Sequence, residues 1–127
     1  MLSLNSSYRY YLYRDYTDLR KGFDSLSGIV RNELSSNPMS GAIFIFFNKR
    51  RNQVKLLHWE GDGFSIYFKR LERGTYELPE FKIEAQKVEI TSQSLMLILQ
   101  GISLRSVKQR TRYVCSQNMD NYASVNA

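Results

Sequence analysis

Two blocks of basic side chains are the residues in this sequence whose chemistry points most directly to a partner. The first block carries four cations and no acid within seven positions: Lys49, Arg50, Arg51 and Lys55. The second block lies near the end: Arg105, Lys108, Arg110 and Arg112. Cationic side chains that meet phosphates release condensed counterions, which gives strong and salt-sensitive binding. With a net charge of +6 and a pI near 9.5, the pattern favours a nucleic-acid partner. The alternative is that these cations only keep the domain soluble.

Carboxylates arranged for metal-dependent catalysis are much harder to find. The best nuclease candidate combines Asp62 with Glu80 and Lys82, two acids and a lysine in a strand-prone region. Asp62, however, belongs to a Gly-Asp-Gly turn, where aspartate is expected for backbone reasons, and Pro79 beside Glu80 marks the end of a strand. We therefore expect no metal site, and a nuclease is the weakest of the alternatives.

Nucleophilic catalysis has no better support in the sequence. His58 is the only histidine and has no serine or cysteine recognisably paired with it, so a structural role is expected. The single Cys115 can form neither an intramolecular disulfide nor a cysteine zinc site. We expect a protein that is not an enzyme, without catalytic residues and without a cofactor.

The expected cellular compartment follows from two features that the sequence lacks, a membrane-spanning segment and a secretory signal. No apolar run reaches the 18 or so residues that a membrane-spanning helix requires, and the first residues, 1–7, lack the charged start and apolar core of a secretory signal. A lone cysteine suits a reducing environment. The sequence thus predicts a cytoplasmic protein with no membrane partner.

The elements that must position the first basic block begin with an aromatic segment and a helix. Residues 8–14 are rich in tyrosine and predict an extended or edge strand, whose rings are expected to pack rather than to stack on bases. A helix is expected over 18–35, capped by Thr17 or Asp18 and ended by Asn37-Pro38. Its apolar stripe contains Leu19, Phe23, Leu26, Val30 and Leu34.

After Gly41 the periodicity changes to that of strands. Strands are expected at 42–47, 54–59, 64–71 and 75–78, joined by short loops into an antiparallel meander, with a further strand within 83–90. Thr91 or Ser92 then caps a short final helix with an apolar face of Leu95, Ile98, Leu99 and Ile102. The fold class is α+β: an antiparallel meander of about four to six strands packed with an N-terminal and a short C-terminal helix. Residues 1–104 form this single domain, and 105–127 form a basic, polar, flexible tail.

Antiparallel pairing of the strands should bring several basic residues to the same end of the sheet. Lys49, Arg50 and Arg51 lie at one hairpin tip, and the third strand returns its far end to the same edge of the sheet. We therefore predict a phosphate-binding edge with two extensions, Lys55 on a strand and a pair at the start of the first helix. The predicted nucleic-acid-binding residues are Arg20, Lys21, Lys49, Arg50, Arg51, Lys55, Lys69, Arg70 and Arg73.

Four parts of the sequence carry a resemblance to a known family: Thr17 to Leu26; Pro38, Ser40 and Gly41 with the Phe-rich strand; Lys55 to Phe64; and Lys69 to Tyr76. In this order and spacing, they resemble the small accessory protein, often labelled TnpB and encoded by the second open reading frame, of the bacterial insertion sequences of family sixty-six. The resemblance covers residues 8–102. His58-Trp59-Glu60 stands where the family more usually has two tryptophans and an aspartate.

The resemblance implies an accessory role in transposition, beside a separate and larger transposase that carries the strand-transfer carboxylates. Together with the charge pattern, it predicts a non-catalytic nucleic-acid-binding module whose target is DNA. The alternative is a protein-interaction module that docks the transposase or a second copy of itself, with Trp59, Tyr67 and Tyr76 as possible anchors. The oligomeric state is left open.

Overall fold

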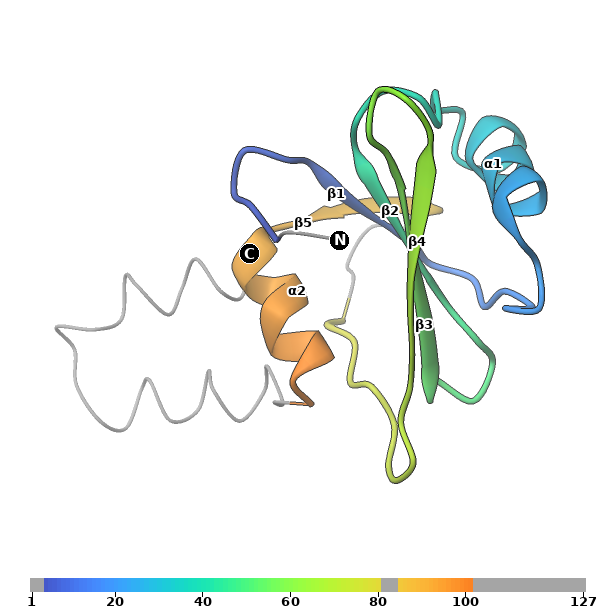
Figure 1. The fold of residues 1–127 in the computed structure, drawn as a ribbon. Coiled ribbons are helices and arrows are strands. Elements are labelled where there is room, and N and C mark those ends of the chain that lie inside the picture. The colour runs from blue at the N-terminus through green and yellow to red at the C-terminus, as the bar shows by residue number, and fades with distance from the viewer. Residues whose placement is uncertain (1–3, 81–84, 102–127) are drawn as a thin grey trace, which may run out of the picture.

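The computed structural model describes residues 4–80 and 85–101. Within them, five strands form one mixed sheet in the order β4-β3-β2-β1-β5, and the two helices lie on opposite sides of it (Figure 1). The expected α+β class, with helices near both ends of the domain, is confirmed. The elements are β1 (Tyr10–Tyr13), α1 (Phe23–Asn32), β2 (Ile43–Phe47), β3 (Gln53–Trp59), β4 (Phe64–Arg70), β5 (Lys87–Ile90) and α2 (Ser92–Leu99).

Strand β2 lies in the middle of the sheet, and every one of its residues is buried. Side chains alternate between faces along a strand, so Phe44 and Phe46 pack on the α1 side, where Leu26 and Val30 of the helix cover them. Ile45 and its alternating neighbours pack on the α2 side. A strand buried on both faces needs a continuous apolar run, which is why this segment shows no polar alternation.

Strand β1 is an interior strand, which corrects the expectation of an edge. It pairs in parallel with β2, with Tyr10 opposite Ile43, and antiparallel with β5 on its other side. The parallel pairing arises because α1 carries the chain across one face of the sheet between the two strands. Tyr10 and Tyr13 are buried, and the Tyr11 ring stacks on Phe44 with centroids 5.8 Å apart, so these tyrosines pack as expected.

Helix α1 is shorter than the expected span of 18–35 at both ends. It begins after Gly22, which has an extended backbone and gives no side-chain cap, so neither Thr17 nor Asp18 caps it. The Asp18 carboxylate instead accepts hydrogen bonds from the backbone and guanidinium of Arg20, which closes a separate turn before the helix. At the other end Ser35 has a φ of 47°, a left-handed conformation that stops the helix before Asn37.

The meander consists of β2, β3 and β4 with the expected antiparallel register, and it ends at Arg70. The strand expected at 75–78 is absent, because Gly74, with a φ of 75°, turns the chain and Tyr76 enters the core. The last strand occupies 87–90 of the predicted 83–90, of which residues 83 and 84 lie outside the described residues. Thr91 caps α2 as expected, its hydroxyl accepting from the Ser94 N–H.

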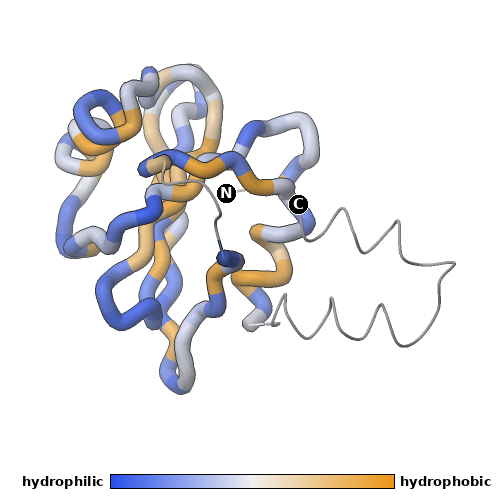
Figure 2. The backbone as a smooth tube through the Cα atoms, turned by 180° about the vertical axis from the view of Figure 1, so that it is seen from behind, coloured by the Kyte–Doolittle hydropathy of each residue, from blue (hydrophilic) through white to orange (hydrophobic). Residues whose placement is uncertain are grey.

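The hydropathy of the backbone follows this layering. In Figure 2 the hydrophobic stretches lie along the sheet and α2, and the connecting loops are mostly hydrophilic. None of the helices in the described part of the chain is long and apolar enough to cross a membrane. The predicted tail, 105–127, and its basic residues Arg105, Lys108, Arg110 and Arg112 lie outside the described residues.

Candidate nucleic-acid interface

The basic turn, residues 48–52 between β2 and β3, is held by the side chain of Asn48. Its Oδ1 accepts from the backbone N–H groups of Asn52 and Gln53, both at 3.0 Å, and its Nδ2 donates to Asn52 Oδ1 at 2.7 Å. Arg51 has a φ of 55°, which an arginine adopts only when its surroundings require it. The amide of Asn48 therefore fixes the backbone from which Lys49, Arg50 and Arg51 project.

A second segment, residues 71–76, runs beside the basic turn and brings further cations to it. The Leu71 N–H donates to Asn52 O, and the Tyr76 N–H donates to Arg51 O, both at 2.7 Å. Gln53 faces Arg70 in the register of β3 and β4. Arg70 and Arg73 thus reach the same end of the sheet as the basic turn, although about twenty residues separate them in sequence.

The segment before α1 supplies the extension of this surface. The Thr17 N–H donates to Phe47 O at 2.8 Å, so this segment starts at the end of β2. It then reaches β3, where Lys55 Nζ donates to Lys21 O at 2.9 Å. The predicted extensions Lys21 and Lys55 therefore lie together on the α1 face of the sheet.

Lys69 does not belong to this surface, which corrects the prediction of one edge containing it. Successive side chains on a strand point to opposite faces, and Lys69 points to the α2 side. There its Nζ donates to Leu99 O at 3.2 Å. A cation at the C-terminal end of a helix meets the negative end of the helix dipole, so Lys69 has a structural role in seating α2.

Two of the predicted cations already have acidic partners. Arg20 Nη2 lies 2.7 Å from Asp18 Oδ2, and Arg70 Nη2 lies 3.3 Å from Glu72 Oε1. The hydrogen-bonded Arg20 guanidinium holds the pKa of the Asp18 carboxyl far below its usual range. In the part of the chain that the structure describes, no salt bridge involves Lys21, Lys49, Arg50, Arg51, Lys55 or Arg73.

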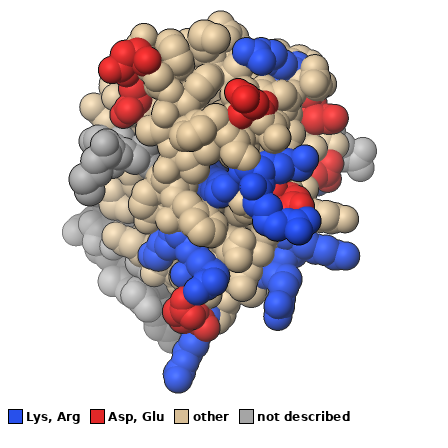
Figure 3. Space-filling view, turned by 45° about the vertical axis from the view of Figure 1, so that its right-hand side comes forward, with Lys and Arg blue, Asp and Glu red and all other residues tan. Residues whose placement is uncertain are grey.

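Charge is unevenly distributed on this side of the molecule. Lys and Arg side chains gather over the lower half of the face in Figure 3, with only a few acids among them. At the other end of β3 and β4 the acidic turn, residues 60–63, carries Glu60 and Asp62. This turn closes with one backbone hydrogen bond, from Glu60 N–H to Gly63 O at 2.9 Å, and Gly61 has a φ of 95°.

Two exposed aromatic rings beside these cations were not among the predicted site residues. Tyr16 is 64% exposed and has Lys49 Nζ 5.6 Å from its ring centroid; Phe68 is 51% exposed and has Lys55 Nζ at 5.4 Å. Phe68 shares one face of β4 with Phe64 and Ile66. Only its position immediately before Lys69 and Arg70 hinted that this apolar residue stands among charges.

Among the groups considered for catalysis, the structure describes Asp62, Glu80 and His58. No group of three His, Cys, Asp or Glu side chains there could hold a metal ion. Asp62 lies in the acidic turn, Glu80 is exposed, and Lys82 is outside the described residues. His58 is 6% exposed and packs edge-on against the Tyr8 ring, with centroids 4.8 Å apart, which fits the expected structural role.

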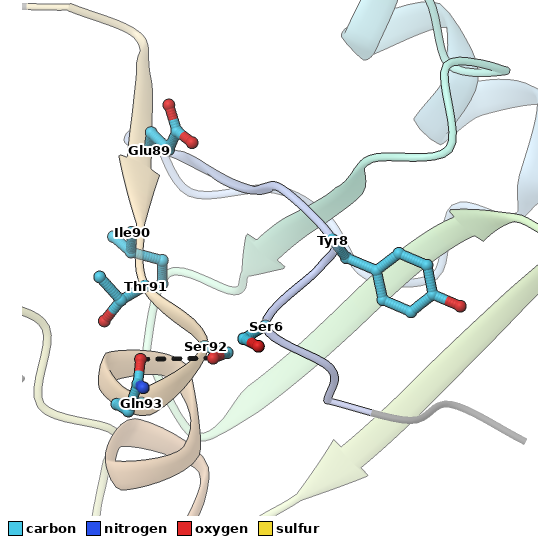
Figure 4. Close-up of a pocket in the computed structure, with 7 residues that line it drawn as sticks. All are labelled: Ser6, Tyr8, Glu89, Ile90, Thr91, Ser92 and Gln93. Carbon is cyan, nitrogen blue, oxygen red and sulfur yellow. Dashed lines mark hydrogen bonds between the residues drawn. The ribbon is translucent and has the colours of Figure 1, made fainter.

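A pocket of about 440 Å³ opens near the start of α2 (Figure 4). Ser6, Glu89, Ser92 and Gln93 are among its lining residues, and the Tyr8 ring points away from it toward the strands. Its one charged lining residue is an acid. The pocket is therefore unsuited to phosphate and is separate from the basic surface.

Comparison with known proteins finds one family model and two similar proteins. The family model described as IS66 Orf2 like protein matches residues 8–109. The uncharacterized protein y4hO of Sinorhizobium fredii is 30% identical over 112 residues, which cover 88% of this chain and 96% of the relative. The uncharacterized protein y4jC of the same organism is 29% identical over 93 residues, covering 73% and 78% of the two chains. No solved structure gives a significant match.

Proposed function

From the premise that this chain belongs to the family of IS66 Orf2 like proteins, we propose that it is a non-catalytic accessory protein of transposition that binds nucleic acid, with DNA as its target. It acts in the cytoplasm, beside the transposase of the same element. The family supports the association with transposition. The binding activity rests on the residues of the chain itself.

The observation that carries the proposal is the convergence of cations at one end of the sheet. The basic turn, the 71–76 segment and the segment before α1 each bring Lys or Arg to this end. Hydrogen bonds join the 71–76 segment to the basic turn, and join the segment before α1 to the end of β2 and to Lys55. Each cation that neutralises a phosphate releases counterions, so binding is strong at low salt and largely independent of sequence. The proposed phosphate-binding residues are Lys21, Lys49, Arg50, Arg51, Lys55 and Arg73, with the acid-paired Arg20 and Arg70 at the margin.

A test removes two cations that no salt bridge restrains in the described part of the chain. We expect Arg50→Ala with Arg51→Ala to lower the salt slope of binding by about 2 and to weaken binding about 30-fold at ~0.15 M salt. The loss should be equal on a duplex from the element end and on a scrambled duplex, because phosphates carry no sequence information. Fluorescence anisotropy across a salt series measures both quantities.

The acidic turn offers a matched control. Glu60→Gln with Asp62→Asn changes charge at an equally exposed turn of the same meander and should leave the salt slope unchanged. If the double arginine variant binds like the parent while deletion of 105–127 abolishes binding, the tail is the nucleic-acid arm and the sheet surface is only solvated.

Docking to the transposase is the second candidate, and one observation favours it. Within the described residues β4 pairs only with β3, and its Tyr67 is 37% exposed. An apolar partner interface keeps its affinity as salt rises, whereas phosphate binding does not. The same salt series with purified transposase as the ligand therefore separates the two functions.

A further inference from the structure

We propose that the target of the basic surface is single-stranded nucleic acid, whose unpaired bases stack on Tyr16 and Phe68 while the neighbouring lysines contact its phosphates. This inference rests on the proposed function, since it specifies which form of nucleic acid the cations hold. The aromatic-basic surface is defined by Tyr16, Lys49, Lys55 and Phe68.

The first support is that each exposed ring has a lysine ammonium beside it. The distances from Nζ to ring centroid are 5.6 Å for Lys49 and Tyr16 and 5.4 Å for Lys55 and Phe68. A nucleotide carries the two complementary groups at similar spacing, a phosphate for the amine and a flat base for the ring. Surfaces that bind single strands combine such stacking rings with a cationic path for the backbone.

The second support is the relative position of the two rings. Phe46, Lys55 and Phe68 are aligned across β2, β3 and β4 in the register. Tyr16 lies near the end of β2, because the N–H of the next residue, Thr17, donates to Phe47 O. Phe46 and Phe68 are thus two strand spacings apart, on the order of 10 Å, and Lys55, whose Nζ donates to Lys21 O, lies on the strand between them. An extended strand crossing β4, β3 and β2 would meet ring, cations and ring in turn.

The third support is the cost of leaving these rings in water. Phe68 is 51% exposed while Phe64 and Ile66, on the same face of β4, are partly buried against the core cluster under α1. A duplex keeps its bases stacked inside and presents its phosphates outward. Its phosphates would contact the cations, but no base would stack on either ring. Unpaired bases give the rings a partner.

The test compares labelled oligothymidylate with a duplex of equal length by fluorescence anisotropy over a salt series. The parent protein should bind the single strand more tightly. Phe68→Ala and Tyr16→Ala should each weaken single-strand binding about tenfold or more, while duplex binding and the salt slope stay unchanged. Met96→Ala is the matched control, because Met96 is a similarly exposed apolar side chain, 42% exposed, on α2 at the other side of the sheet.

Phe68→Leu separates stacking from packing, since leucine keeps an apolar side chain and lacks the aromatic face. It should behave like Phe68→Ala in binding and like the parent in thermal unfolding, whereas Phe68→Trp should retain single-strand affinity.

The outcomes distinguish this inference from the proposed function. If the parent binds duplex and single strand equally and the ring variants change neither, while the double arginine variant weakens both, the inference fails and the proposed function stands. If the parent binds neither form at low salt, both fail. If sedimentation shows that the parent self-associates and Phe68→Ala makes it monomeric with no change in single-strand binding, the rings are a subunit interface and the inference is overturned.

Discussion

The two turns that join the strands of the meander have the same task in the fold and very different surroundings. The acidic turn closes through one backbone hydrogen bond around Gly61 and faces solvent. The basic turn is cross-linked by the Asn48 side chain and braced from outside by the backbone of Leu71 and Tyr76. Like charges gathered at one turn repel one another, and the basic turn is the one that is held rigidly. A charged turn can therefore form part of a larger basic surface when neighbouring segments both fix its backbone and add charge beside it.

Removing the side chain of Tyr76, whose backbone supports the basic turn, should have the largest effect on stability. Tyr76 is 1% exposed and packs on Phe47 with ring centroids 5.5 Å apart. We expect Tyr76→Ala to lower the free energy of unfolding by about 3–5 kcal/mol, as for a buried aromatic ring. Phe64, which flanks the acidic turn and packs on Trp59, is only partly buried. Phe64→Ala should cost about 1–2 kcal/mol. Urea unfolding measures both, and equal losses would contradict the contrast between the two turns.

The next effect concerns the turn residues themselves. Asn48→Ala removes three hydrogen bonds at a partly buried site and should cost about 2 kcal/mol, because the N–H groups of Asn52 and Gln53 lose their acceptor. Asp62→Ala in the acidic turn should change the free energy of unfolding by less than about 0.5 kcal/mol. Chemical unfolding followed by far-UV circular dichroism gives both values. A loss of similar size at Asp62 would mean that the acidic turn is as firmly held.

Backbone conformation should produce effects of different size at the two turns. Gly61 has a φ of 95°, and Gly61→Ala should cost about 1 kcal/mol because a side chain is strained there. Arg51 has a φ of 55°, so Arg51→Gly relieves backbone strain in the folded state. Glycine also raises the conformational entropy of the unfolded chain, and this offsets the gain. The change in unfolding free energy should lie within about 0.5 kcal/mol of zero. Thermal melts of the two variants check this, and a large loss in Arg51→Gly would show that the arginine side chain itself stabilises the turn.

The smallest effect at neutral pH should come from the Tyr76 hydroxyl. It is buried and has no hydrogen-bond partner in the part of the chain that the structure describes. Tyr76→Phe should therefore change the free energy of unfolding by no more than about 0.5 kcal/mol, or raise it slightly.

The same variant should differ at alkaline pH. Burial raises the pKa of Tyr76 from 10.0 to about 12, so the unfolded chain gives up this proton first as the pH rises past 10. Below pH 10 the group contributes no pH dependence; between 10 and 12 it progressively lowers the stability of the parent. Tyr76→Phe removes that contribution, and its stability should fall less steeply in this window. Tyr10 and Tyr13, whose pKa values are also raised by burial, keep part of the slope. Identical slopes in denaturant titrations at pH 9 to 11 would contradict the assignment.

Much of the fold could be predicted from local patterns. The strands at 42–47, 54–59 and 64–71 each appear within one residue of their expected bounds, because apolar runs bounded by turn residues are local signals. Thr91 was one of two expected caps for α2 and is the one used. The predicted cap of α1 failed because two partners compete for one carboxylate. Asp18 had two ways to use its carboxylate, and the guanidinium of Arg20 prevailed over the N–H groups of the helix start.

For the candidate site, the sequence alone sets the number of cations and the end of the sheet at which they lie, because antiparallel pairing of adjacent strands returns the end of β4 to the start of β3. Which of these cations share a surface depends on the tertiary structure. One step along β4 sends Lys69 to the α2 side and leaves Phe68 and Arg70 on the α1 side, where Lys55 meets Lys21. The choice of face depends on which side each helix covers, and that depends on the parallel crossover from β1 to β2, a contact between segments about thirty residues apart. Local sequence carries no direct record of such a contact, so the surface is a property of the assembled sheet.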